Sequence, residues 1–102
     1  MNNIKYDIIE YRMYFDFPRM FLVKANDRTL YFLCKMDEFD EHYDYFDVYL
    51  MPDTLLSDIP DDWTCLENDS DKYLGQIKIS DMMFDSTRKK YIEINSSNIL
   101  AY

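Results

Sequence analysis

Apolar and polar residues alternate over several short stretches of the chain, which is the pattern of strands with one buried face. Residues 19–25 and 29–36, joined by a polar turn at residues 26–28, predict a β-hairpin. Its second strand places one set of apolar side chains on the same face: Leu30, Phe32, Cys34 and Met36. Residues 43–51 predict a third strand, in which Phe46, Val48 and Leu50 face away from Tyr43, Tyr45, Asp47 and Tyr49.

The remaining stretches predict shorter elements. Residues 8–17 alternate as a strand that Pro18 ends, although Ile4, Ile8, Tyr11 and Phe15 would also form a helical stripe; we favour the strand. Residues 53–59 and 80–84 predict two short helices, and residues 60–71 an acidic loop. Residues 73–79, interrupted by Gly75, and 90–94 predict two further strands. The pattern therefore predicts one α+β domain over residues 1–102, a mostly antiparallel sheet with two short helices.

The aromatic composition indicates that the outer face of this sheet must be covered. The core is bulky, since the chain has ten Tyr, seven Phe and seven Met but one Gly. Tyr31 and Leu33 of the hairpin would join Tyr45 and Tyr49 on the outer side. Because so aromatic a face is seldom left bare, we expect helices, a second subunit in a homodimer, or a partner to cover it. Trp63 is interpreted as a core lid in preference to an interface hot spot.

Charge is concentrated in the middle of the chain. The net charge is −9, yet residues 37–71 alone hold thirteen carboxylates and no Lys or Arg. Such a field opposes direct binding to nucleic acid or to an anionic membrane and favours a basic protein partner. We expect residues 37–47, which lead into a strand, to be held more rigidly than the loop at 60–71 and so to contribute more to binding. The predicted partner-binding residues are Asp37, Glu38, Asp40, Glu41, Tyr43, Asp44, Tyr45, Asp47 and Tyr49.

Candidate chemistry is sparse. Gly75 is the one glycine, so phosphate-binding loops, dinucleotide fingerprints and nucleophile elbows are excluded. His42 lies among acidic residues that favour its protonated form, which makes it a poor catalytic base. The acidic residues lack the glycine and the final glutamate of a calcium loop. A metal-dependent hydrolase of nucleic acid is a distant alternative, because this segment has no basic residue to hold substrate phosphates. We predict no catalytic residue, metal or cofactor, free thiols at Cys34 and Cys65, and a cytoplasmic location without signal peptide or membrane span.

Two resemblances add to this interpretation. Residues 18–84 carry a Pro-led apolar strand at Pro18, a polar turn at Asp27, an Asp37-Glu38 pair and a Gly-x-Ile segment at Gly75. This pattern resembles small uncharacterised bacterial and phage domains, which implies a fold and no activity. In size, acidity and Tyr-rich composition the chain resembles phage-encoded inhibitors of host nucleases, including anti-CRISPR proteins. The resulting hypothesis is a non-catalytic inhibitor that occupies a basic nucleic-acid-binding site; the alternative is a cytosolic interaction domain without nucleic-acid mimicry.

Overall fold

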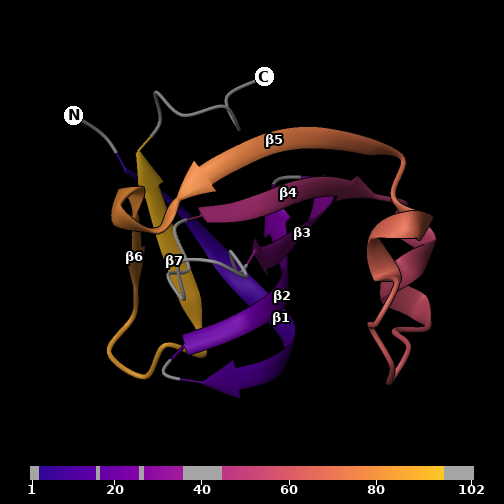
Figure 1. Cartoon of the computed structure of the whole chain (residues 1–102), viewed down its shortest axis with the longest axis horizontal. Helices are drawn as coiled ribbons and strands as arrows, with labels where there is room; N and C mark the ends of the chain where they lie inside the picture. Colours follow the sequence, from indigo (N-terminus) through magenta and orange to yellow (C-terminus); the bar gives the residue numbers. More distant parts are fainter. Residues whose placement is uncertain (1–2, 16, 26, 36–44, 96–102) are drawn as a thin grey trace.

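The described part of the chain forms a single curled sheet of seven antiparallel strands (Figure 1). The computed structural model describes residues 3–15, 17–25, 27–35 and 45–95. The strands are β1 (Asn3–Phe15), β2 (Phe17–Ala25), β3 (Arg28–Lys35), β4 (Tyr45–Met51), β5 (Lys72–Lys78), β6 (Met82–Phe84) and β7 (Tyr91–Asn95). Their order in the sheet is β5-β4-β3-β2-β1-β7-β6, and the sheet bends into a half-barrel.

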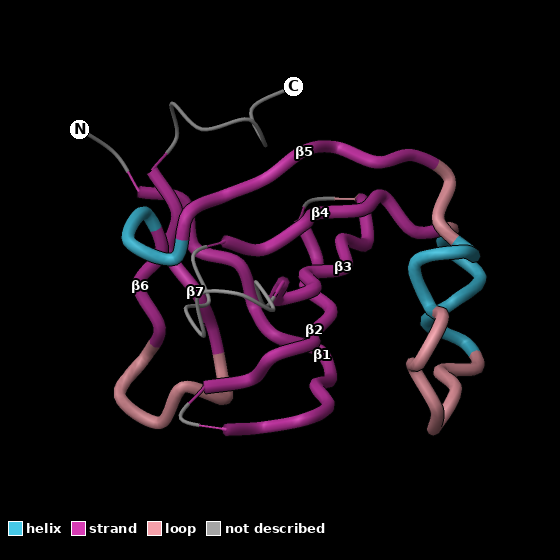
Figure 2. Tube along the Cα trace, viewed as in Figure 1, coloured by secondary structure: helices cyan, strands magenta, loops and turns pink. Residues whose placement is uncertain are grey.

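The prediction of an α+β fold with two short helices is wrong. In the described part of the chain the helical segments are short 3-10 turns: η1 (Asp53–Ser57), η2 (Leu66–Asp69) and η3 (Ile79–Asp81) (Figure 2). Seven residues between Pro52 and Pro60 are too few to offset the cost of nucleating an α-helix, so only a 3-10 turn forms there. The other expected helix, residues 80–84, ends in strand β6. No helix among the described residues is long and apolar enough to cross a membrane.

The strand predictions are confirmed for the hairpin, for the third strand and for the first. The hairpin is β2–β3, with Phe21 opposite Phe32 and Leu22 opposite Tyr31. In β1 the register with β2 shifts between Ile8 and Glu10, so Tyr11 returns to the inner side. This bulge explains why the sequence of β1 also matched a helical stripe. Pro18 does not itself end β1; it lies in β2, paired with Tyr14 across the turn.

The inner core lies inside the half-barrel and is rich in aromatic rings. Phe21 stacks on Phe32 with ring centroids 4.9 Å apart, and Phe46 meets Phe21 edge-on at 5.3 Å. All seven described strands contribute buried side chains to it. They are Tyr6, Phe21, Val23, Leu30, Phe32, Phe46, Val48, Ile77, Met82, Ile92 and Ile94.

A second, outer core covers the opposite face of the central strands. Met20, Leu22, Tyr31 and Met51 come from the sheet, while Trp63 and Leu66 come from the segment after β4. The aromatic face that was expected to need a cover is thus covered by the chain itself, through 3-10 turns and a loop, with no second subunit required to bury Tyr31.

The Tyr31 hydroxyl is a polar group enclosed in this outer core. Tyr31 is 0% exposed, and its hydroxyl has no hydrogen-bond partner among the described residues. Burial, with smaller contributions from Glu67 and Tyr49, raises the pKa of Tyr31 well above its ordinary value. The hydroxyl is therefore neutral and desolvated, a state that costs free energy of folding.

The turn between β6 and β7 is built around the buried carboxylate of Asp85. This carboxylate accepts hydrogen bonds from the Thr87 hydroxyl and from the backbone N–H groups of Thr87, Lys90 and Tyr91. Burial acts to raise the pKa of Asp85, but these hydrogen bonds together outweigh it and hold the pKa well below its ordinary value. The ionised carboxylate thereby fixes the turn that joins the two strands.

We predict that Tyr31→Phe leaves the free energy of unfolding unchanged or raises it by up to about 1 kcal/mol, because it removes an unpaired buried hydroxyl. Urea unfolding measures the effect. Tyr73→Phe is the matched control, since it deletes a hydroxyl that donates to Asp47 at 2.8 Å, and it should lower stability by about 1 kcal/mol. A loss of that size in Tyr31→Phe would contradict the prediction.

We also predict a pH-dependent contribution from Asp85. Because its pKa is lower in the folded than in the unfolded state, the ionised group stabilises the fold above about pH 4, and this stability is lost as the pH falls through the folded pKa. Asp85→Asn should lower the free energy of unfolding by about 1 to 2 kcal/mol at pH 7. The difference in stability between the native protein and the variant should become smaller as the pH falls. Unfolding curves from pH 7 to 2 test this, with Asp81→Asn at an exposed position as the charge-matched control.

Candidate binding surface

The predicted binding residues divide into a described and an undescribed group. Six of them lie outside the described residues: Asp37, Glu38, Asp40, Glu41, Tyr43 and Asp44. The other three, Tyr45, Asp47 and Tyr49, alternate on the outer face of β4 as predicted. The structure therefore locates one end of the predicted surface on this strand.

These three β4 residues are more enclosed than a free binding face would be. Asp47 is 6% exposed and accepts a hydrogen bond from the Tyr73 hydroxyl. Tyr49 packs against the outer core, 5.2 Å from the Tyr73 ring, and Tyr45 is half-buried. Burial, followed by the hydrogen bond to Asp47 and its charge, raises the pKa of Tyr73 to about 12. Asp47 thus organises the junction of β4 and β5 beneath the exposed Tyr73 ring.

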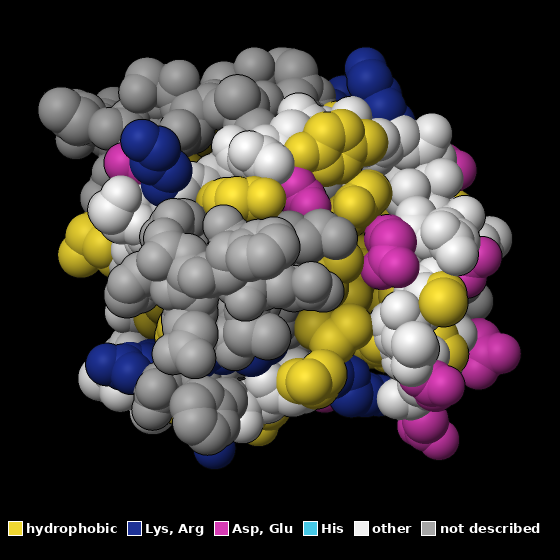
Figure 3. All heavy atoms as spheres, in the orientation of Figure 1, with side chains coloured by type: hydrophobic (Ala, Val, Ile, Leu, Met, Phe, Trp, Pro, Cys, Tyr) yellow, Lys and Arg dark blue, Asp and Glu magenta, His cyan; other side chains and the backbone are white. Residues whose placement is uncertain are grey.

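The second half of the acidic block forms a distinct lobe at one end of the molecule. We call residues 53–71 the acidic cap; it holds seven carboxylates and no Lys, Arg or His. Figure 3 shows acidic side chains gathered at this end, at the right of the view. All except the half-buried Glu67 are exposed: Asp53, Asp58, Asp61, Asp62, Asp69 and Asp71.

The acidic cap is anchored, which corrects the expectation of a loosely held loop at residues 60–71. Trp63 is 2% exposed and meets the Tyr31 ring edge-on, with centroids 5.8 Å apart. Its indole N–H donates to the Pro60 carbonyl at 2.6 Å. Leu66 is buried beside it, and Leu55 packs against the same cluster. The interpretation of Trp63 as a core lid is confirmed, and the carboxylates around it are held on a fixed framework.

Arg12 of β1 fastens the acidic cap to the sheet. Its Nε donates to the Asp61 carbonyl at 3.1 Å and its Nη2 to the Pro60 carbonyl at 3.2 Å. The guanidinium carbon lies 4.6 Å from the centre of the Trp63 ring, a cation–π contact. The carboxylate of Glu10 lies 3.3 Å from Nη1. The Arg12 side chain therefore joins the backbone of the cap and its Trp63 anchor to β1, the strand that pairs with β2 of the central hairpin.

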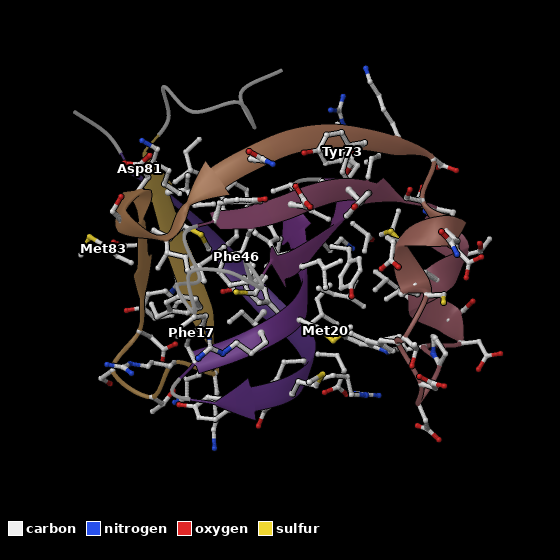
Figure 4. The ribbon with its side chains drawn as sticks, in the orientation of Figure 1. Phe17, Met20, Phe46, Tyr73, Asp81 and Met83 are labelled. Carbon is white, nitrogen blue, oxygen red and sulfur yellow. The ribbon has the colours of Figure 1, made fainter. Side chains whose placement is uncertain are left out.

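A pocket opens at the seam between β1 and the acidic cap. It is lined by Arg12, Met13, Met20, Asp61, Asp62, Trp63 and Thr64, and Figure 4 shows Met20 on the side of the sheet that faces the cap. Met13 is 72% exposed and has a positive φ of 55°. The carboxylate of Asp62 accepts from the hydroxyl and the backbone N–H of Thr64, which lowers the pKa of Asp62.

Sequence reasoning missed Arg12 and Met13, because neither belongs to the acidic block and no short motif links β1 to residues 60–63. Among the described residues no group of three or more His, Cys, Asp or Glu side chains is placed to hold a metal ion. Cys34 and Cys65 are free thiols, as predicted. No family model, curated protein or solved structure matches the chain.

We predict that Arg12→Gln loosens the acidic cap more than it changes the sheet. Loss of two charge-assisted hydrogen bonds and the contact with Trp63 should lower the free energy of opening the cap by about 1 to 3 kcal/mol. Amide hydrogen exchange at Leu66, Asn68 and Ser70, which donate within the cap, measures this. Lys24→Gln, at an exposed position of β2, is the control. Equal exchange in the two variants would contradict the role of Arg12.

Proposed function

We propose that the protein is a non-catalytic inhibitor that presents its acidic surface to a basic, nucleic-acid-binding site on another protein. The proposed target is a defence nuclease in the host cytoplasm, such as a CRISPR-Cas effector. The observation that supports this proposal is the acidic cap, where seven carboxylates and no cation are held on a framework anchored by Trp63 and Arg12.

The physical reason is competition for the cations that bind phosphate groups. Duplex DNA presents one negative charge per roughly 1.7 Å of helix axis, and Lys and Arg side chains in a nuclease groove are placed to meet them. A fixed array of carboxylates can occupy the same cations without ordering a flexible segment, which would cost about 1 to 2 kcal/mol per residue. The carboxylates of the anchored cap avoid most of this cost, so the cap can contribute more to binding than a mobile loop of equal charge.

Tyr45, half-buried on the outer face of β4, is included in the proposed surface, whereas the predicted binding residues between 37 and 44 lie outside the described part of the chain. Asp47 is excluded from direct contact in this proposal, since it is buried and already bonded to Tyr73. Its effect on a partner would be indirect, through the placement of the Tyr73 ring, which is 49% exposed. The proposed surface therefore joins a carboxylate array to the exposed ring of Tyr73, a combination suited to a protein groove.

A competition assay tests this function. Labelled duplex DNA is bound to purified CRISPR-Cas effectors, and its displacement is followed by fluorescence anisotropy at several salt concentrations. The cap variant carries Asn at Asp53, Asp58, Asp69 and Asp71. The control variant removes four charges elsewhere, at Asp7, Asp27, Asp81 and Glu93.

We expect the native protein to displace DNA and the cap variant to need at least about tenfold more protein, with a weaker salt dependence. The control variant should act like the native protein. Equal losses in the two variants would favour the alternative function, an interaction domain whose acidity serves solubility. Failure of the native protein to displace DNA from any effector would contradict inhibition by mimicry.

A further inference from the structure

We propose that the pocket between β1 and the acidic cap receives one Arg or Lys side chain of the partner protein. This inference rests on the proposed function and assigns a specific contact within it. The pocket has a volume of about 210 Å³ and opens to solvent, so it can admit a side chain without opening the fold.

The apolar part of the pocket suits the aliphatic stem of such a side chain. Met20 is 8% exposed and Trp63 is 2% exposed, so both are held in place by the outer core. Met13 stands at the mouth and is 72% exposed. Methionine is flexible and polarisable, so Met13 can fold over an incoming methylene chain. Lys and Arg side chains commonly lay their stems on apolar surface while keeping the charged head in contact with polar groups.

The polar part of the pocket selects a cation. Asp61 and Asp62 line it, and the side chain of Asp61 is fully exposed. The single positive group, Arg12, already donates to three backbone carbonyls, those of Tyr11, Pro60 and Asp61, and lies 3.3 Å from a Glu10 carboxylate oxygen. Carboxylate oxygens of Glu10 and Asp61 lie 3.3 and 3.9 Å from the guanidinium, and Asp62 adds a further carboxylate to the pocket lining. The negative charge therefore exceeds the single positive charge and favours a second cation at the rim.

Other occupants fit this pocket less well. An apolar side chain would remove water from the carboxylates of Asp61 and Asp62 without adding a hydrogen bond or ion pair to those they already make with Thr64 and Arg12, which is unfavourable. An acidic side chain would meet the same carboxylates as like charges. A cationic side chain with a long stem satisfies both halves of the pocket, so charge complementarity and shape select the same residue types.

Methionine-methyl NMR with short peptides tests the pocket directly. Three peptides of one sequence carry arginine, its neutral isostere citrulline, or norleucine at the central position. The protein carries ¹³C-labelled Met methyl groups and ¹⁵N-labelled Trp, and the signals of the Met13 and Met20 methyl groups and of the Trp63 indole N–H are followed. The pocket variant is Asp61→Asn with Asp62→Asn, and the charge-matched control is Asp53→Asn with Asp58→Asn, which lie outside the pocket.

We expect the arginine peptide to shift the three signals saturably and the neutral peptides to bind about two- to fivefold more weakly, as loss of ion pairs at a partly exposed site implies. The pocket variant should show the same weakening and the control variant little change. Met13→Ser should also weaken binding, whereas Met83→Ser, at an exposed methionine of β6, should not. Melting curves verify that each variant is folded.

Three results would overturn the inference. They are equal binding of the arginine and citrulline peptides, equal weakening in the pocket and control variants, and shifts that spread over the acidic cap but spare Met13 and Met20. Each of these results is compatible with displacement of DNA by the native protein. The two assays also change different residues, since the cap variant of the DNA assay leaves Asp61 and Asp62 unchanged. Failure of the pocket is thus distinguishable from failure of the proposed function.

Discussion

The fold depends on one constraint: the two central strands are apolar on both faces. Successive residues of β2 from Met20 to Val23 are all buried, and Tyr31 and Phe32 of β3 point to opposite sides at 0% exposure. A sheet with two such faces needs two covers. Curling of the sheet supplies the inner one, and residues 53–69 supply the outer one. The acidic cap is ordered because the outer face would otherwise remain in contact with water.

This arrangement places the seven carboxylates of the acidic cap over an apolar cluster. Mutual repulsion among the exposed carboxylates opposes the compact cap, while burial of Trp63 and Leu66 holds it closed. Arg12 relieves part of the conflict, since its guanidinium neutralises charge at the seam and packs on the Trp63 ring. Apart from the half-buried Glu67, the acidic side chains stay in water while the backbone that carries them is anchored.

Much of the strand structure could be predicted from the sequence, because alternation directly records which side chains face a core. The hairpin and the faces of β4 follow from that pattern. The burial of Trp63 was predicted on a different ground, the tendency of a single large aromatic side chain to cover a core. The helix predicted at residues 53–59 was wrong because the segment between Pro52 and Pro60 is too short for more than a 3-10 turn. The helix predicted at residues 80–84 was wrong because residues 82–84 pair with β7 as strand β6. The candidate surface was predicted less well. Arg12 lies 48 to 49 residues before its partners in the cap, and a contact over that separation leaves no local signal.

The place of β7 in the sheet has a consequence for synthesis of the protein. β7 pairs with β1, so Tyr6 lies opposite Ile92 across an interval of more than eighty residues. Side chains from both strands, with Met82 of β6, close the inner core. A ribosome must therefore release residue 95 before this core can be completed. Until then the hairpin strands expose apolar surface, which makes the nascent chain a substrate for chaperones and delays the last step of folding.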